Sequence, residues 1–300
     1  MTTFGARAGV VGTAVSIVLA AVGIGAVTAS PGDVAGPASR GRVAVVPINF
    51  TNDRSTPFSQ SDAEAWTFSG DRSVAAYYRE ASLGALSLTG DTFDWQELAV
   101  STGTKCRYWE WLDAAEAQMG DRLAGYDTVV YAAPNVAACG FDGVTDAIGD
   151  DRVFVNGLTS ADKWLKIVAH ELGHTLGADH ARTYTCVDQG ETVMLSRSCE
   201  ESGYDPFDLM GLGNDHLPNA NHLDAMGLLA PRSAVTVAAP GQRDITIGPL
   251  HTMGPDPRLI RIPYDRDADG NDRYLLLEYR QPSTYDDFEP DDPVVTGVTA

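Results

Sequence analysis

Three of the six histidines in this 300-residue chain lie within eleven residues, in the stretch HELGHTLGADH at positions 170–180. On a helix, residues four apart are rotated by only about 40° and rise by about 6 Å, so His170 and His174 share one face. Zinc binds imidazole nitrogen at about 2.1 Å, and both rings can therefore reach one ion. The residue types and their spacing predict a zinc site.

Glu171 follows the first histidine and is rotated from it by about 100° around the helix axis. Its carboxylate therefore points in a different direction from the two histidine rings. It would lie beside the open coordination position, where metal-assisted hydrolysis requires a general base. Gly177 lets the chain leave the helix, and His180 is the expected third ligand. Asp179 is an alternative ligand that the adjacent histidine makes unnecessary. A helix with three metal-free histidines is the competing interpretation, but it would need three separate polar partners.

The pattern around the histidines predicts the elements that position them. Ser160 can cap a helix whose apolar residues, among them Trp164, Val168 and Leu172, recur at three-to-four spacing and form a buried stripe. Buried strands are expected at 42–50, 127–134 and 151–157, an alternating strand at 86–95, and helices at 73–84 and 113–126. This order predicts an α+β fold with a twisted sheet packed on helices.

The predicted domain organisation has four parts. Residues 1–29 have a positive residue, an uncharged apolar run and a small-residue site, which predicts a cleaved secretory signal; a membrane anchor is the alternative. A Pro/Gly-rich linker follows at 30–42, then the main domain at 43–230. Short runs in which apolar and polar residues alternate predict a small β module at 231–300. An incomplete module is left open as an interpretation.

The four cysteines are Cys106, Cys139, Cys186 and Cys199. An even number in an exported chain favours two disulfides, for which three pairings are open. The short loop favours Cys186–Cys199, and elimination then leaves Cys106–Cys139. Free thiols fit export poorly, and no pair has the Cys-x-x-Cys spacing typical of a zinc cluster.

The formal charge of −20 argues against nucleic acid and anionic membrane surfaces as partners. The segment 265–273 resembles the start of a calcium loop, but position twelve would be Leu276 where a glutamate is needed, so Ca²⁺ lacks a complete motif and a hairpin turn is expected. The stretch 286–293 is expected to be a solvated acidic turn. For His216 and His222, structural or surface roles are favoured over a role in the cleft.

The pattern H-E-x-x-H-x-x-G-x-x-H resembles the metzincin signature, and metzincins also carry a downstream Met-turn. YDPFDLMG at 204–211 looks like that turn, with Met210 thirty residues after His180. In the family this methionine packs beneath the three histidines without binding zinc. The resemblance implies a metzincin-like zinc metalloprotease domain and a secreted endopeptidase with Glu171 as base. It implies protein or peptide substrates. No organic cofactor is expected, and no stable membrane insertion is expected after cleavage of the signal.

The stretches YYREASLGALSLTGDTFDW, PNANHLDAMGLL and YLLLEYRQP are most similar to the gametolysin-type secreted metallopeptidases. Ala181 departs from the residues that mark several other metzincin families at this position. Leu212 replaces the tyrosine that serves as an extra ligand in some of them, so three histidines and water are expected. The resemblance also implies a sheet edge that binds an extended peptide, for which 151–157 or the strand after Gly84 are the candidates. A catalytically weak zinc-bearing adhesion protein and a zinc hydrolase of cell-wall material are the alternative functions.

Overall fold

The computed structural model describes residues 15–18, 41–193, 196, 198–211, 214–230, 232–237, 244–266 and 270–296. Within them the chain forms two compact units. The larger unit holds residues 33–230 together with 283–287, and the other holds 231–282 and 288–300 with the first 32 residues. The predicted signal and linker lie outside the described residues, except for the last two linker positions and the short strand β1 (Val15–Val18), which pairs with β12 (Asp244–Ile247).

The larger unit is built on a six-stranded sheet with the order β3-β2-β5-β7-β6 and with β4 paired to β2. The strands are β2 (Arg42–Phe50), β3 (Thr89–Thr92), β4 (Gln96–Leu98), β5 (Thr128–Ala133), β6 (Gly143–Thr145) and β7 (Arg152–Asn156). All pairings are parallel except β6 with β7, which is antiparallel. The helical elements are α1 (Gln60–Glu64), the π-helical turn Ala65–Ser69, α2 (Val74–Ala81), α3 (Tyr108–Met119), the 3₁₀ turn Gly120–Leu123, α4 (Ala161–Leu176) and α5 (Ala220–Ala225).

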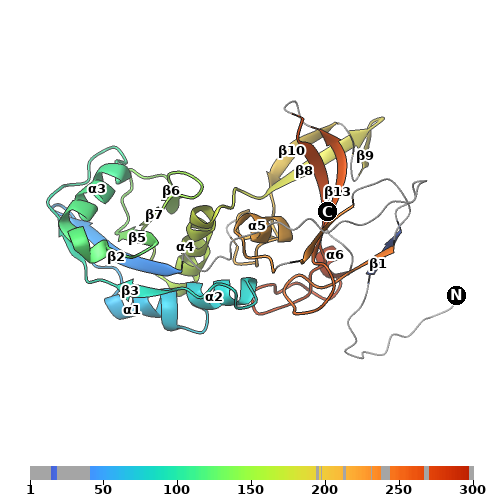
Figure 1. Ribbon diagram of the computed structural model, residues 1–300. Helices are drawn as coiled ribbons and strands as arrows, with labels where there is room; N and C mark the ends of the chain where they lie inside the picture. The colour runs from blue at the N-terminus through green and yellow to red at the C-terminus, as the bar shows by residue number, and fades with distance from the viewer. Residues whose placement is uncertain are drawn as a thin grey trace. The chain divides into compact units, whose positions relative to one another are not determined.

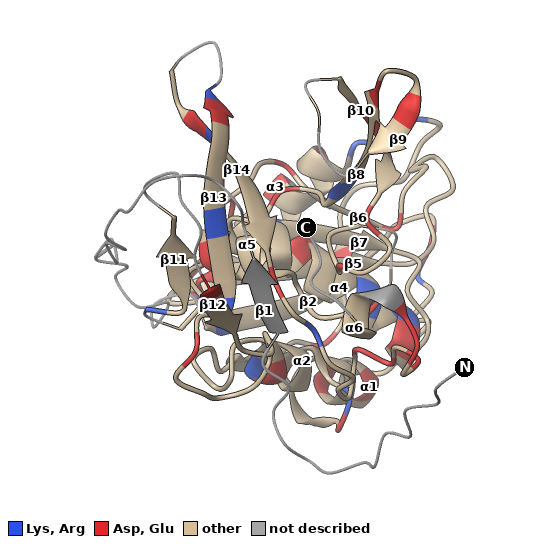
Figure 2. Ribbon diagram, turned by 90° about the vertical axis from the view of Figure 1, so that its right-hand side faces the viewer, with Lys and Arg blue, Asp and Glu red and all other residues tan. Residues whose placement is uncertain are grey.

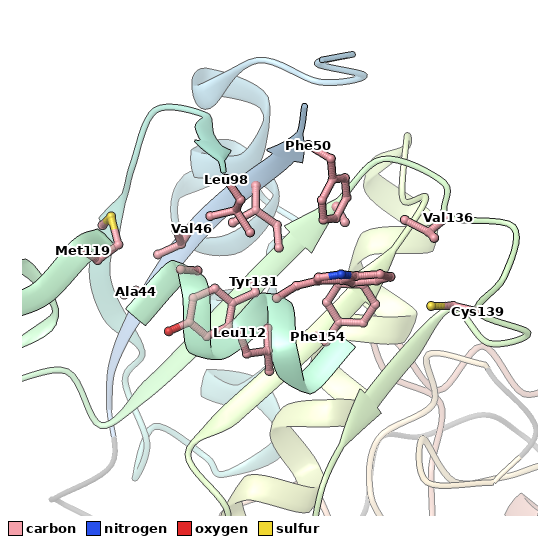
Figure 3. Packing of buried hydrophobic residues seen from close by; sticks show 14 residues of the cluster. Ala44, Val46, Phe50, Leu98, Leu112, Met119, Tyr131, Val136, Cys139 and Phe154 are labelled. Carbon is pink, nitrogen blue, oxygen red and sulfur yellow. The ribbon is translucent and has the colours of Figure 1, made fainter. Parts of the chain in front are cut away.

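Helix α3 covers one face of the sheet (Figure 1). Its Leu112 packs among alternate residues of the central strands (Figure 3). The Trp111 ring of the same helix lies edge-on to the Phe50 ring, with centroids 5.0 Å apart. The cluster comprises Ala44, Val46, Ile48, Phe50, Leu98, Trp111, Leu112, Ala115, Met119, Tyr131, Ala133, Val136, Cys139 and Phe154. The central strands are buried on both faces because helices cover both, which explains their continuous apolar runs.

The opposite face of the sheet carries α4. This helix contacts β6 and β7, and α2 packs against it. The predicted sheet packed on helices is therefore confirmed. The helix predicted at 113–126 begins earlier, at Tyr108, and ends at Met119, because Gly120 has φ of 53°. The strand predicted at 86–95 is shorter, covering Thr89–Thr92.

A second, three-stranded sheet follows α4 in the larger unit, with the order β10-β8-β9. Its strands are β8 (Arg182–Asp188), β9 (Glu191–Val193) and β10 (Cys199–Tyr204). Cys186 and Cys199 lie opposite each other in the register of β8 and β10 and form one disulfide, and Cys106–Cys139 forms the other. Both bridges favoured by the sequence are present.

The smaller unit holds β11 (Ala234–Thr236), β12, β13 (Leu259–Arg266), β14 (Asp272–Leu277) and α6 (Pro293–Thr296). Strands β13 and β14 pair antiparallel on either side of the predicted turn, and residues 267–269 of that turn lie outside the described part of the chain. Acidic residues occur on the ribbons of both units (Figure 2), so the net charge is not confined to one element. Among the described residues, no helix combines the length and apolar character needed to cross a membrane.

The prediction of a solvated acidic turn at 286–293 is wrong at its first residue. Asp286 is fully buried and its carboxylate accepts a hydrogen bond from the backbone N–H of Leu217 at 2.9 Å. Nearby, Arg72 donates to the carbonyl oxygen of Thr284, and the Tyr285 ring lies 5.0 Å from that of Tyr77. Residues 283–287 therefore belong to the larger unit, although they follow β14 in the chain.

Candidate metal centre

Helix α4 brings the first two histidines together. Ser160 caps its N-terminus by accepting a hydrogen bond from the N–H of Lys163, as predicted. The buried stripe includes Trp164, Val168 and Leu172, which leaves the His170 and His174 rings on one face with centroids 4.9 Å apart.

The ring orientation of both helical histidines is set by backbone carbonyls. His170 Nδ1 lies 2.9 Å from the carbonyl oxygen of Leu209, and His174 Nδ1 lies 2.8 Å from that of Ala178. A carbonyl can only accept, so each Nδ1 carries the proton and each Nε2 keeps its lone pair. Burial lowers the pKa of His170 to about 4 and also lowers the pKa of His174. Both rings are therefore neutral near pH 7, as metal ligands must be.

The third histidine reaches the same point because α4 ends abruptly. Gly177 has φ of 114°, a conformation that favours glycine, and the N–H of Ala178 turns back to the carbonyl of Gly173 at 2.9 Å. One ring nitrogen from each of His170, His174 and His180 then lies within 4.8 Å of the others. A tetrahedral site with 2.1 Å bonds needs nitrogens about 3.4 Å apart, which small ring movements would provide. Asp179 instead accepts a hydrogen bond from the N–H of His180.

Glu171 lies under the sheet edge formed by β6. Its Oε2 accepts a hydrogen bond from Thr145 Oγ1 at 2.9 Å, and a Cβ added at Gly143 would be 2.7 Å from its Oε1. Burial raises the pKa of Glu171 to about 7, although the Thr145 hydrogen bonds act in the opposite direction. A carboxyl group with such a pKa can both accept and release a proton near neutral pH.

The edge strand beside the candidate site is β6, and this corrects the sequence expectation. Strand β7, predicted from 151–157, lies inside the sheet between β5 and β6, and β3, the strand after Gly84, lies at the other edge. Neither Thr145 nor β6 was predicted, because three residues of Gly, Val and Thr give no periodicity that a sequence pattern could detect.

Met210 packs against α4 between the two helical ligands. A Cβ added at Gly173 would be only 2.4 Å from Met210 Sδ, so the methionine occupies the space that glycine leaves. The backbone on either side is also fixed, because the N–H of Ala181 donates to the carbonyl of Met210 at 2.9 Å. The turn around Met210 thereby holds the carbonyl of Leu209 against His170. Leu212 lies outside the described residues.

A buried ion pair supports this turn. Asp208 is fully buried, and its carboxylate accepts hydrogen bonds from the N–H groups of Met210 and Asn219, each at 2.6 Å. Its Oδ2 also lies 3.0 Å from Nδ1 of the buried His222. Although burial acts to lower the pKa of His222, the hydrogen bond and charge of Asp208 raise it overall. Although burial acts to raise the pKa of Asp208, the partnership with His222 lowers it.

His222 therefore has a structural role, as the sequence favoured. His216 is partly buried, and its Nδ1 lies 3.2 Å from the carbonyl oxygen of Tyr285. Neither the His216 ring nor the His222 ring belongs to the group formed by His170, His174 and His180, which could hold a metal ion.

A pocket of about 270 Å³ adjoins the cluster. It is lined by Asp142, Gly143, Lys166, Ile167, His170, Glu171 and Gly211. Asp142 is paired with Lys163 at 2.8 Å, whereas Lys166 lies 3.8 Å from Asp215, which also pairs with Arg72. Two cations thus share one carboxylate at the Lys166 side of the pocket.

Gly173→Ala should lower the free energy of unfolding by about 1–2 kcal/mol, because the added Cβ collides with the buried Met210 and overpacking outweighs the gain of about 1 kcal/mol in helix propensity. Urea unfolding of the full chain measures the change. Gly140→Ala is the control, since a Cβ there meets nothing within 4 Å. A Gly173→Ala protein as stable as the parent would contradict the packing argument.

Asp208→Asn or His222→Gln should each cost about 3–5 kcal/mol, because each leaves a buried partner without its counter-ion. The double variant should lose less than the sum of the two, as measured in a denaturant double-mutant cycle.

The pH dependence of this coupling follows from the directions of the two pKa shifts. Stability from Asp208 is lost as pH falls through its lowered pKa, and stability from His222 is lost as pH rises through its raised pKa. The coupling should be greatest between about pH 4 and 6.5 and should weaken on either side; additive losses would refute the pairing.

Comparisons with known proteins address the segment that holds the histidines. Residues 107–205 match the family model of the metallo-peptidase family M12B, reprolysin-like. No curated protein matches the chain. One solved structure found by the comparison is metalloproteinase-II from Bacteroides fragilis, with 15% identity and a TM-score of 0.37, covering 63% of this chain and 52% of that one. The chain thus spans about half the length of that structure. The gametolysin-type assignment stays a prediction, whereas residues 107–205 are similar to a reprolysin-like metallopeptidase domain.

Proposed function

We propose that the chain is a secreted zinc-dependent endopeptidase that hydrolyses peptide bonds of extracellular proteins. The observation that carries this proposal is the convergence of three imidazole nitrogens next to the buried carboxyl group of Glu171, whose pKa burial raises to about 7. His170, His174 and His180 would hold one Zn²⁺, leaving the fourth position open. The two disulfides and the signal-like N-terminus are compatible with secretion.

The metal and two side chains of the site would each have a distinct role in hydrolysis. When bound, zinc would supply Lewis-acid activation of the water and the scissile carbonyl. Glu171 would take a proton from the attacking water and deliver it to the leaving amine, a cycle that its pKa near 7 suits. Thr145 would hold the carboxyl group in place through its hydrogen bond to Oε2.

The substrate backbone would lie along β6. This strand is at the edge of the sheet, so its outward-facing backbone groups could pair with an extended peptide. Gly143 lines the pocket, and its lack of a side chain lets β6 lie close to the buried Glu171 carboxyl group. A substrate side chain next to the scissile bond could then enter the pocket.

Glu171→Gln should abolish hydrolysis of casein, with a loss of at least about 10²–10⁴-fold, because the base is removed without changing side-chain volume. Zinc content, measured by elemental analysis, should stay at the parent's level, and Glu191→Gln on an exposed strand is the matched control. His180→Ala should lower zinc content. A Glu171→Gln protein that cleaves as fast as the parent would exclude Glu171 as the base.

The same assay separates the alternatives. A zinc-bearing adhesion protein would bind the metal but cleave nothing, and a cell-wall hydrolase would act on wall fragments while leaving casein and peptides intact.

The pocket should prefer an acidic side chain. Lys166 lines the pocket, and its carboxylate partner Asp215 lies 3.8 Å away and is shared with Arg72, so the charge of Lys166 is only partly neutralised. Peptide pairs that differ by Glu or Lys beside the scissile bond should be cleaved with kcat/KM values about 2–5-fold higher for Glu, the size expected of a solvent-screened pair. Lys166→Gln should remove the preference, whereas Lys163→Gln, whose cation pairs with Asp142, should not. An equal preference in parent and Lys166→Gln would disprove this role.

A further inference from the structure

The third histidine differs from the other two in how its ring is held. The rings of His170 and His174 each have a backbone carbonyl partner at Nδ1. Across the described part of the chain, no hydrogen bond fixes the ring of His180; only its backbone N–H is bonded, to Asp179. His180 also lies beyond the end of α4, so the helix does not restrict its orientation. Its ring contacts the rings of the two other histidines, with centroids 5.3 Å and 4.8 Å away, and one further aromatic ring.

The contact from outside the group of histidines is with Tyr204. The Tyr204 ring lies 5.8 Å from the His180 ring at an interplanar angle of 86°, an edge-to-face arrangement that aromatic rings favour. Tyr204 is the last residue of β10 and is 40% exposed, so its ring is not needed to fill a core. An exposed aromatic side chain next to a metal ligand is better explained by the contact than by burial.

Tyr204 is itself held in place from β8. Arg182 is the residue directly opposite it across the two strands, and the guanidinium carbon lies 4.1 Å from the Tyr204 ring centroid. Arg182 Nη1 in turn lies 3.0 Å from Glu201 Oε1. These contacts form a continuous series from Glu201 through Arg182 and Tyr204 to His180.

The Cys186–Cys199 bridge fixes the register on which this series depends. The two cysteines are opposite each other in the same strand pair. A slip of one residue would turn the side chain of Tyr204 to the other face of the sheet, away from His180. The register is irregular between Glu201 and Gly203, and the covalent link restrains the pairing on the other side of this irregularity.

We propose that Tyr204 is a positioning residue for His180, and that the disulfide-linked β8–β10 sheet thereby sets the affinity of the site for Zn²⁺. The inference rests on the metal site in the proposed function, but it does not depend on peptide hydrolysis. Residues that orient a ligand without touching the metal change metal affinity by about 10–100-fold when removed.

The test measures the dissociation constant for Zn²⁺ by competition with a chromogenic chelator, using the full chain. Tyr204→Ala should weaken zinc binding about 10-fold, and Tyr204→Phe, which keeps the ring, should stay within about 2-fold of the parent. Tyr184→Ala is the matched control, because Tyr184 is an exposed tyrosine of β8 that is 61% exposed. The visible spectrum of the Co²⁺-substituted protein should shift in Tyr204→Ala alone, which a general loss of stability would not produce.

A second pair of variants tests the disulfide. Replacing Cys186 and Cys199 by serine should weaken zinc binding in the same direction, whereas replacing Cys106 and Cys139 should not. If Tyr204→Ala fails to fold, Tyr204→Leu serves in its place. If a folded Tyr204→Ala or Tyr204→Leu protein binds Zn²⁺ as tightly as the parent does, this inference is overturned and the proposed function is not affected. Loss of affinity in Tyr204→Phe overturns the ring contact as its basis, and a parent that binds no Zn²⁺ overturns the proposed function itself.

Discussion

The candidate site depends on the close approach of Met210 to α4 at Gly173. No residue with a side chain could stand at this position without moving the methionine, because even a Cβ would be 2.4 Å from its sulfur. The approach brings the carbonyl of Leu209 to His170 and the carbonyl of Met210 to the N–H of Ala181, directly after His180. One contact between a helix and a turn therefore helps to position both the ligands on the helix and the ligand that follows its end.

Burial shifts the pKa values of the site in two opposite directions, and both shifts favour hydrolytic chemistry. It lowers the pKa of the histidines, which keeps their nitrogens free for a metal, and it raises that of Glu171 to about 7. The same burial would disfavour the charges of Asp208 and His222 if each were alone. Their mutual hydrogen bond offsets that cost, and the carboxylate also satisfies two backbone N–H groups of the turn. The charged pair thus satisfies backbone groups of the turn, while burial keeps the helical histidines neutral.

The features that could be predicted from the sequence are those that depend on the spacing of residues within one element. The i, i+4 histidines, the serine cap, the glycine at the helix end and the apolar stripe of α4 all follow from the geometry of one helix. Thr145, β6 and Tyr204 could not be found in this way, because each acts through a contact between segments distant in sequence. Asp286 was misjudged for the same reason: among acidic neighbours it resembles a solvated turn, yet the N–H of Leu217 binds it in a buried position.

Residues 283–287 explain why the larger unit is not a continuous stretch of chain. The carbonyl of His216 accepts a hydrogen bond from Tyr77 at 2.7 Å, and Leu217 donates to Asp286, so the segment that follows the Met-turn is held from both sides. One of those sides is contributed by residues that come after β14. Asp215, which pairs with Lys166 at the pocket, directly precedes this held segment. The carboxylate that pairs with Lys166 is therefore positioned partly by residues 283–287, which lie far beyond the zinc motif in the sequence and between two stretches of the smaller unit.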